Sequence, residues 1–172
     1  GFISSGIVTI IFGILFLLTN LDHDRKITLP QAFLLTALSW LSIAIFGSLP
    51  FIFSEINLSA TDAFFESMSG ITTTGSTIIT NLNETPKSIL LWRGMLQWLG
   101  GIGIIVMAIT LMPLMNIGGM QLFIISTSDT PEKILPRSKE IALRLILIYS
   151  GLTFVCALFY KIFGMNFFDS VV

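Results

Sequence analysis

Long apolar runs alternate with short polar segments along this chain. Four stretches contain no Asp, Glu, Lys or Arg: residues 1–21, 27–54, 94–128 and 145–160. A helix needs about 20 mostly apolar residues to cross the hydrocarbon core of a bilayer. The pattern therefore predicts an all-helical polytopic membrane protein, with spans at residues 1–21, 29–53, 86–114 and 137–163.

The ends of the third span are marked by residues that favour helix termini. Thr85 is a candidate N-cap, and Pro86 suits the first turn because its missing N–H is not needed there. Pro113 and the glycine pair at 118–119 supply a stop. We expect residues 115–136 to form a linker on the cytoplasmic side.

The segment between the second and third spans, residues 59–83, contains an amphipathic stretch that is too short to cross the membrane. We expect a short helix at residues 61–71. From Asp62 to Ile71 it would reach about 15 Å at about 1.5 Å per residue, half the hydrocarbon thickness of about 30 Å. Non-helical backbone at that depth is tolerated only where it is buried in protein or lines a cavity. The pattern predicts a re-entrant loop, in which a half-length helix is followed by a polar return segment.

The basic residues are distributed as such a loop requires. With a re-entrant loop, one side of the membrane holds six of them, Arg25, Lys26, Lys133, Arg137, Lys139 and Arg144, and the other side holds three, Lys87, Arg93 and Lys161. A segment that crossed fully would divide them five against four. Because cytoplasmic loops carry an excess of Lys and Arg, this count favours the re-entrant topology.

Hydroxyl side chains and one glycine follow the half-length helix directly, in the run from Ile71 to Thr77. A cation that enters a membrane loses its water, and backbone carbonyl oxygens aimed at a common axis can replace it. Gly75 suits such a backbone because it adopts dihedral angles that other residues avoid. The helix dipole would present its negative end to the ion, and Asp62 suits its positive start. The run predicts an ion filter at residues 72–77, and the alternative is an ordinary polar loop.

Composition narrows the class of protein. The chain is 53% hydrophobic and 11% charged with a mean hydropathy of +0.90, too apolar for a water-soluble domain of 172 residues. The lipid bilayer is therefore its main partner. The net charge of -1 and the scattered basic residues exclude the basic stripe that nucleic acid requires. The sequence also lacks G-x-S-x-G, H-E-x-x-H and an intramembrane carboxylate pair, so we expect neither an enzyme nor a cofactor.

An internal repeat is visible at a spacing of about 107 residues. Leu29-Pro30 opens the second span and Leu135-Pro136 the fourth, while Asp62 and Asp169 follow these spans in corresponding positions. Membrane pores and carriers are often built from such copies. We expect a piece of a longer protein. Its predicted parts are an accessory helix, a first helix–loop–helix repeat, a linker and the start of a second repeat, at residues 1–21, 29–114, 115–136 and 137–172.

Three motifs resemble the first pore repeat of the Trk/Ktr/HKT superfamily of potassium transporters, and of its bacterial TrkH type in particular. They are Asp62–Gly75 (DAFFESMSGITTTG), Trp92-Arg93, and Gln97–Ile104 (QWLGGIGI). The resemblance covers nearly the whole chain and implies four such repeats around one pore, of which this chain carries the N-terminal part. It also implies potassium uptake across the cell (inner) membrane by a homodimer, with a cytosolic nucleotide-binding regulatory subunit of the RCK/KTN type.

By the same resemblance, the central filter glycine falls on Gly75, and the filter ligands are Thr72, Thr73, Thr74, Gly75 and Ser76. K+, the transported ion, would be held through Thr73, Thr74 and Gly75, with Asp62 and Glu66 as filter support. Plant relatives with serine in place of the first filter glycine tend to favour sodium, so the glycine here implies potassium. Two alternatives stay open: a sodium-translocating relative of the same fold, and a secondary carrier with an interrupted helix at its binding site.

Three further features have competing interpretations. Glu66 either accepts backbone N–H bonds behind the filter or lines a wet vestibule. Arg93 either pairs with Glu66 or Glu84, or extends to the lipid headgroups, and we expect the extension. The glycine-rich run at residues 100–103 predicts close helix packing rather than a nucleotide loop, because no strand precedes it.

Overall fold

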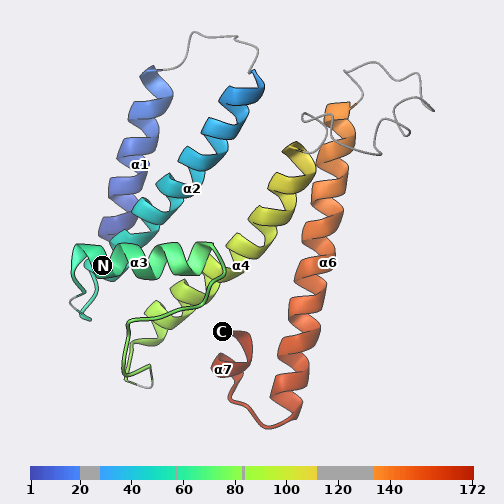
Figure 1. Cartoon of the computed structure of the whole chain (residues 1–172). Coiled ribbons are helices and arrows are strands. Elements are labelled where there is room, and N and C mark those ends of the chain that lie inside the picture. Colours follow the sequence, from blue (N-terminus) through green and yellow to red (C-terminus); the bar gives the residue numbers. More distant parts are fainter. Residues whose placement is uncertain (20–27, 57, 83, 112–133) are drawn as a thin grey trace. The chain divides into compact units, whose positions relative to one another are not determined.

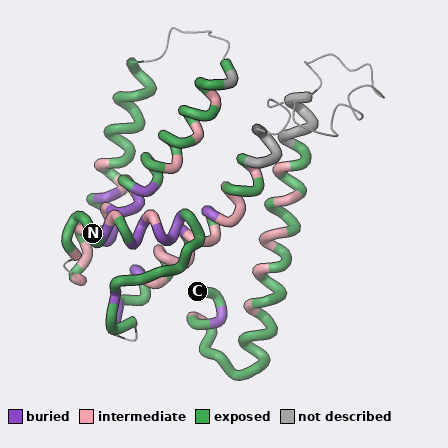
Figure 2. The backbone as a smooth tube through the Cα atoms, in the orientation of Figure 1, coloured by how far each residue is buried: buried purple, intermediate pink, exposed green. Residues whose placement is uncertain are grey.

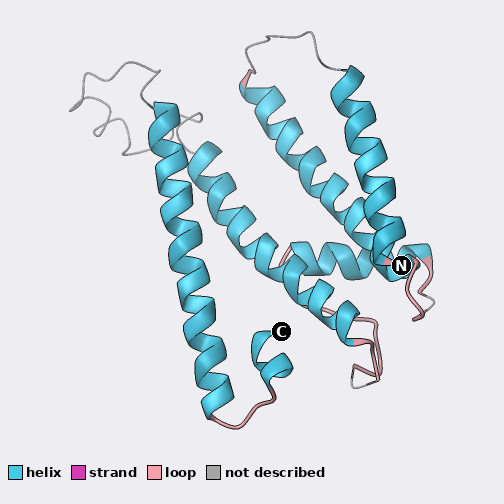
Figure 3. Ribbon diagram, turned by 180° about the vertical axis from the view of Figure 1, so that it is seen from behind, coloured by secondary structure: helices cyan, strands magenta, loops and turns pink. Residues whose placement is uncertain are grey.

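The computed structural model describes residues 1–19, 28–56, 58–82, 84–111 and 134–172. Among these residues the regular structure is entirely helical (Figure 3). The helices are α1 (Phe2–Thr19), α2 (Leu29–Ile52), α3 (Ala60–Ile71), α4 (Lys87–Leu111), α6 (Ile134–Ile162) and α7 (Phe167–Val171) (Figure 1). The chain divides into two compact units, Gly1–Gly101 and Ile102–Val172.

Four of the described helices are long and apolar enough to cross a membrane: Phe2–Thr19, Pro30–Ile52, Lys87–Met107 and Glu140–Ile162. Their apolar side chains are widely exposed within the chain. Leu17 of α1 is 65% exposed and Phe154 of α6 is 70% exposed, and no residue between 140 and 162 is buried. Surfaces of this kind are stable in lipid, which is as apolar as the side chains themselves. The prediction of an all-helical, multi-pass membrane protein is confirmed.

The ends of α2 follow from its sequence. The Gln31 side chain accepts a hydrogen bond from the Thr28 backbone N–H at 2.9 Å, which satisfies a donor ahead of the first turn. Pro30 lies in that first turn, where its missing N–H costs nothing. Pro50 lies in the last turn, and the helix ends at Ile52, within one residue of the expected end at 53.

The short helix α3 packs across the end of α2 within the first unit (Figure 1). Its N-cap is Ser59, whose hydroxyl accepts from the Asp62 backbone N–H at 3.2 Å. The core of this unit consists of Phe51, Ala63, Ile89 and Leu96, contributed by α2, α3 and α4. Figure 2 shows buried residues gathered along α3 and at the adjoining end of α2. Within this unit, the shortest helix is therefore the most enclosed one.

The start of α4 differs in detail from the expected N-cap. The Pro86 carbonyl accepts the N–H groups of Ile89 and Leu90, at 2.9 and 3.2 Å, so Pro86 takes the capping position itself. The Thr85 hydroxyl instead donates to the Asn81 carbonyl at 2.9 Å. The expectation that Thr85 caps this helix is wrong, because its side chain closes the preceding turn. The expected helix end at 114 lies outside the described residues.

In the second unit, α6 begins at Ile134, three residues before the expected start at 137. Pro136 is accommodated because it falls in the first turn. The short helix α7 follows its N-cap Asn166, as α3 follows Ser59. These two caps are about 107 positions apart, the spacing of the sequence repeat. Most of the expected linker, residues 115–133, lies outside the described residues.

Candidate ion filter

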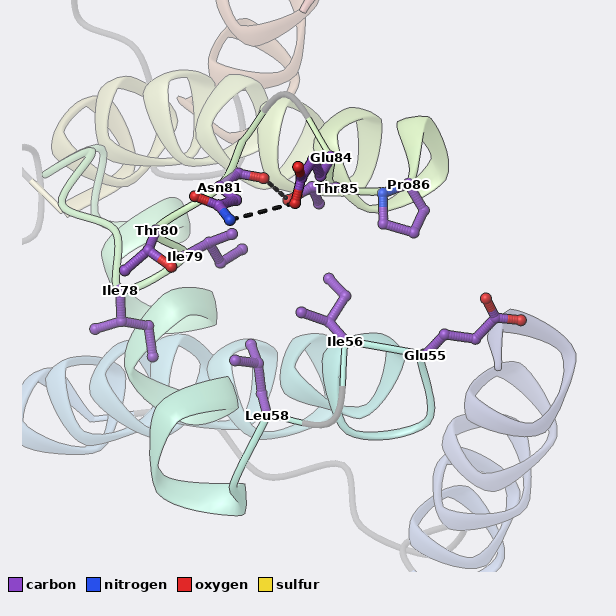
Figure 4. Close-up of a pocket in the computed structure, with 10 residues that line it drawn as sticks. All are labelled: Glu55, Ile56, Leu58, Ile78, Ile79, Thr80, Asn81, Glu84, Thr85 and Pro86. Atoms are coloured by element: carbon purple, nitrogen blue, oxygen red, sulfur yellow. Dashed lines mark hydrogen bonds between the residues drawn. The ribbon is translucent and has the colours of Figure 1, made fainter.

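The connections before and after α3 lie beside each other. Glu55, Ile56 and Leu58 precede α3, whereas residues 78–81 and 84–86 follow the return segment, and together they line a cavity of about 450 Å³ (Figure 4). The chain therefore enters and leaves this region at the same place. With 12 residues, α3 is about 18 Å long at about 1.5 Å per residue, well short of a bilayer's hydrocarbon core.

The return segment, residues 72–77, is the expected ion filter (the filter segment), and its backbone is unusual. Thr73 has φ of 59° and Gly75 has φ of 76°, so left-handed residues occupy two alternate positions within it. A regular extended strand turns successive peptide groups to opposite sides, and left-handed residues interrupt that alternation. Thr73 is β-branched, so its backbone is strained. The filter segment is thus not an ordinary strand.

The N–H groups of residues 72–75 in the filter segment point back to the C-terminal end of α3. Those of Thr74 and Gly75 donate to the Ser69 carbonyl at 3.1 and 3.3 Å, and that of Thr73 donates to the Gly70 carbonyl at 2.9 Å. The Thr72 N–H and hydroxyl both donate to the Met68 carbonyl, at 3.0 and 2.8 Å. The negative end of α3 is therefore joined directly to the filter segment.

The carbonyl oxygens of the segment fall into two groups. The Gly75 carbonyl accepts from Arg93 Nη2 at 2.7 Å, and the Ser76 carbonyl accepts from Ser69 Oγ at 2.6 Å. No donor among the described residues reaches the carbonyls of the preceding three residues, Thr72, Thr73 and Thr74. These residues are exposed in the chain, so their carbonyls are available to a cation.

Glu66 lies behind the filter segment and is fully buried, with 0% of the residue exposed. Its Oε2 accepts from the Thr77 hydroxyl and from the Ile78 backbone N–H, both at 3.1 Å. Its Oε1 accepts from Arg93 Nε at 2.5 Å. The Glu66 carboxylate thus makes the contact of the first interpretation, since it accepts a backbone N–H just beyond residues 72–77.

The expectation that Arg93 extends to the headgroups is wrong. Its guanidinium forms an ion pair with Glu66, and only 17% of its side chain is exposed. A buried carboxylate needs a counter-charge far more than an arginine at the membrane surface needs water, so pairing prevails. Charged residues within membrane spans usually face the protein interior and have a partner there, so the position of Arg93 in the third span favoured pairing over extension to the headgroups.

Gly100 lets the end of α3 approach α4 closely. A Cβ at this position would collide with the carbonyl oxygen of Ile71, the last residue of α3. Only glycine accepts backbone at such a short distance. The interpretation of this glycine-rich run as a site of close packing is confirmed at Gly100.

Comparison with known proteins decides the family. Residues 1–171 match the family TrkH, described as "Cation transport protein". The chain belongs to the TrkH family of cation transport proteins. It is 48% identical over 83% of its length to the Trk system potassium uptake protein TrkI of Halomonas elongata, covering 29% of that protein. It is 41% identical over 99% of its length to the Trk system potassium uptake protein TrkH of Vibrio parahaemolyticus, covering 36%.

A third relative of this TrkH-family chain is the Trk system potassium uptake protein TrkH of Escherichia coli K12, 44% identical over 88% of the chain and 32% of that protein. The chain spans about a third of the length of these curated relatives. The family is one of membrane cation transporters rather than enzymes, and the name "Trk system" is that of a system with several components.

Within the TrkH-family site, the structure brings Glu66 to the filter segment but leaves Asp62 apart. Asp62 lies exposed in the first turn of α3, at the opposite end of the helix. The contact of Ser69 with the Ser76 carbonyl and that of Thr77 with Glu66 were missed, and the pairing of Arg93 with Glu66 was the alternative that was not preferred. The positive charge of Arg93 next to an apolar run could have indicated a buried ion pair. No sequence periodicity, however, connects the Ser69 hydroxyl to the carbonyl of Ser76, seven positions later.

Proposed function

We propose that this chain is part of the pore-forming subunit of a potassium uptake system, which moves K+ across the cell membrane through a filter of backbone carbonyls. The filter ligands are Thr72, Thr73, Thr74, Gly75 and Ser76, with K+ held chiefly through Thr73, Thr74 and Gly75. The observation that carries this proposal is that, among the described residues, no donor reaches the carbonyls of residues 72–74, which follow the end of a half-length helix. The names of the Trk system relatives support potassium as the ion.

The physical basis is replacement of the hydration shell. A monovalent ion that leaves water needs several oxygen dipoles at once, and an ionised ligand would hold it too tightly to release it. The C-terminal end of α3 adds the negative end of a helix dipole beside the filter segment. Glu66 contributes no net charge to the ion, because Arg93 neutralises it.

One filter segment provides only one side of such a site. We propose that the full-length protein carries four repeats around one pore, and that the repeat seen in α2–α4 recurs from α6 onward. The whole protein would work in the cell (inner) membrane as a homodimer with a cytosolic nucleotide-binding regulatory subunit. It would need no cofactor, because transport makes and breaks no covalent bond.

Replacement of Gly75 by serine tests the proposal. At φ of 76° any Cβ is strained, by about 1–2 kcal/mol, so Gly75→Ser should shift the filter segment and weaken discrimination between K+ and Na+. Initial uptake of both ions would be measured for the full-length protein in cells that lack other potassium uptake systems. The wild-type protein should take up K+ in preference to Na+.

Gly164→Ser is the matched control. Gly164 also has positive φ, 99°, but it lies in the turn after α6. As at Gly75, nothing lies within 4 Å of the place where a Cβ would be. The substitution should carry a similar backbone strain and keep the wild-type K+/Na+ ratio. Equal ratios for wild-type and Gly75→Ser proteins, at equal amounts in the membrane, would contradict the assignment of the filter.

A further inference from the structure

The arginine of α4 links the filter segment to its buried carboxylate. We propose that Arg93 is a positioning residue of the filter: its guanidinium fixes the direction of the Gly75 carbonyl, while Glu66 cancels its charge. The inference rests on the proposed function, since it assigns a role within that filter. It concerns selectivity rather than conduction itself, because Arg93 acts on the ion through Gly75.

The geometry of arginine suits this double contact. Nε donates to Glu66 Oε1 at 2.5 Å and Nη2 donates to the Gly75 carbonyl at 2.7 Å. The guanidinium is planar and rigid, so its two donors fix the carboxylate and the carbonyl relative to each other. The contact also joins α4 to the filter segment, 18 positions earlier in the chain.

Glu66 holds the other end of the same segment. Its Oε2 receives the Thr77 hydroxyl and the Ile78 N–H, two and three positions beyond Gly75. Gly75 has no side chain with which to restrain its own peptide group, and nothing lies within 4 Å of the place where a Cβ would be. The direction of its carbonyl therefore depends on Arg93 alone among the described side chains.

The bond to Arg93 is compatible with ion binding by the same oxygen. A carbonyl oxygen has two lone pairs, so one can accept from the guanidinium while the other remains for a cation. A bare guanidinium so close to the pathway would repel K+. Glu66 removes this repulsion, and both charges are largely shielded from water, with 17% of the Arg93 side chain and 0% of the Glu66 side chain exposed.

The test uses the full-length protein and begins with three single variants at Arg93 and Glu66. Arg93→Gln should lower the K+/Na+ uptake ratio by about tenfold, the order of the factor expected for losing a hydrogen bond to a charged donor. Arg93→Lys should give an intermediate ratio, because one ammonium cannot reproduce the two-point contact. Glu66→Gln should raise the KM for K+, since it leaves an uncompensated positive charge beside the filter.

The double variant separates positioning from simple structural support. In Glu66→Gln with Arg93→Gln the charge is again balanced, so the KM for K+ should fall back towards the wild-type value while the K+/Na+ ratio stays low. A merely structural pair would change the amount of folded protein in the membrane and leave KM and ratio untouched. Lys161→Gln is the charge control, because Lys161 is an exposed basic residue at the end of α6. This variant should behave as wild type.

The outcomes distinguish a failure of the proposed function from a failure of the positioning role of Arg93. Wild-type protein that takes up no K+ would overturn the proposed function and this inference with it. Wild-type uptake of K+ together with an unchanged ratio and KM in Arg93→Gln would overturn the inference alone. If Arg93→Gln does not accumulate in the membrane, Arg93→Lys provides the test instead. Its K+/Na+ uptake ratio must be lower than that of the wild type for the inference to stand.

Discussion

Thr73 and Gly75 share a left-handed backbone, although only Gly75 lacks a Cβ. The φ of 59° at Thr73 costs a β-branched residue about 1–2 kcal/mol. The Thr73 N–H donates to the Gly70 carbonyl, which helps to hold this conformation. Strain of this kind persists only where the surrounding structure enforces it, and it is typical of ligand-binding segments.

Replacement of Thr73 by glycine separates carbonyl ligation from hydroxyl ligation. Thr73→Gly keeps the carbonyl, removes the hydroxyl and relieves the backbone strain. If the carbonyl is the ligand, the KM for K+ should change by less than about tenfold, a factor that corresponds to about 1.4 kcal/mol. The full-length protein should also unfold at a temperature no lower than that of the wild type, which thermal unfolding in detergent would measure.

Thr73→Val is the companion variant. Valine keeps the β-branched shape and its strain but has no hydroxyl. Retained K+ affinity in both variants supports ligation by the backbone, whereas loss of affinity in both would assign the ligand to the Thr73 hydroxyl and contradict the carbonyl filter.

The hydrogen-bond partners of Glu66 were the least predictable part of the candidate site. Glu66 and Arg93 are 27 positions apart and on different helices, so no local pattern connects them. The hydroxyl-rich run and Gly75 were recognisable because ligand chemistry and backbone freedom are properties of single residues. Partners such as Ser69 and Thr77 become apparent only when the chain has turned back on itself.

At the scale of the helices, the approach of α3 to α4 depends on one position. A Cβ at residue 100 would collide with the Ile71 carbonyl, and backbone on both sides leaves little room to adjust. Gly100→Ala should therefore destabilise the full-length protein by about 1–3 kcal/mol, the usual cost of overpacking. Thermal unfolding in detergent measures the effect.

Gly13→Ala in α1 is the matched control for that substitution. Nothing lies within 4 Å of a Cβ at residue 13, so the added methyl group should be neutral or should stabilise the helix by up to about 1 kcal/mol. Equal unfolding temperatures for Gly100→Ala and Gly13→Ala would contradict the close approach of the two helices.

The presence of each helix was predictable from the sequence, whereas the residues at which the helices begin and end were less predictable. The expected helix at 61–71 corresponds to α3, Ala60–Ile71, because a short apolar stretch between polar segments has little choice of length. The start of α6 at Ile134 precedes the expected start because proline is as acceptable inside a first turn as ahead of it. The capping role expected of Thr85 failed because α4 begins at Lys87, which places Pro86 at the N-cap position, while the Thr85 hydroxyl donates to the Asn81 carbonyl.

At the scale of the whole molecule, the repeat makes a prediction about the full-length sequence. A second segment rich in Thr and Ser, with a glycine at about position 182, should follow α7 at the repeat spacing. Reading the continuing sequence checks its presence. A serine in place of that glycine should weaken K+/Na+ discrimination as Gly75→Ser does, and a continuation without such a segment would favour a carrier of different architecture.

The ion pair between Glu66 and Arg93 also has a consequence for biosynthesis. As the polypeptide leaves the ribosome, the carboxylate emerges 27 residues ahead of its only cationic partner among the described residues. Until then, lipid would have to accept an unpaired acid, which is costly. If residues 72–77 form the proposed filter, we therefore expect the loop to settle into the bilayer after α4 has been synthesised and inserted, so that its own downstream neighbour completes the filter.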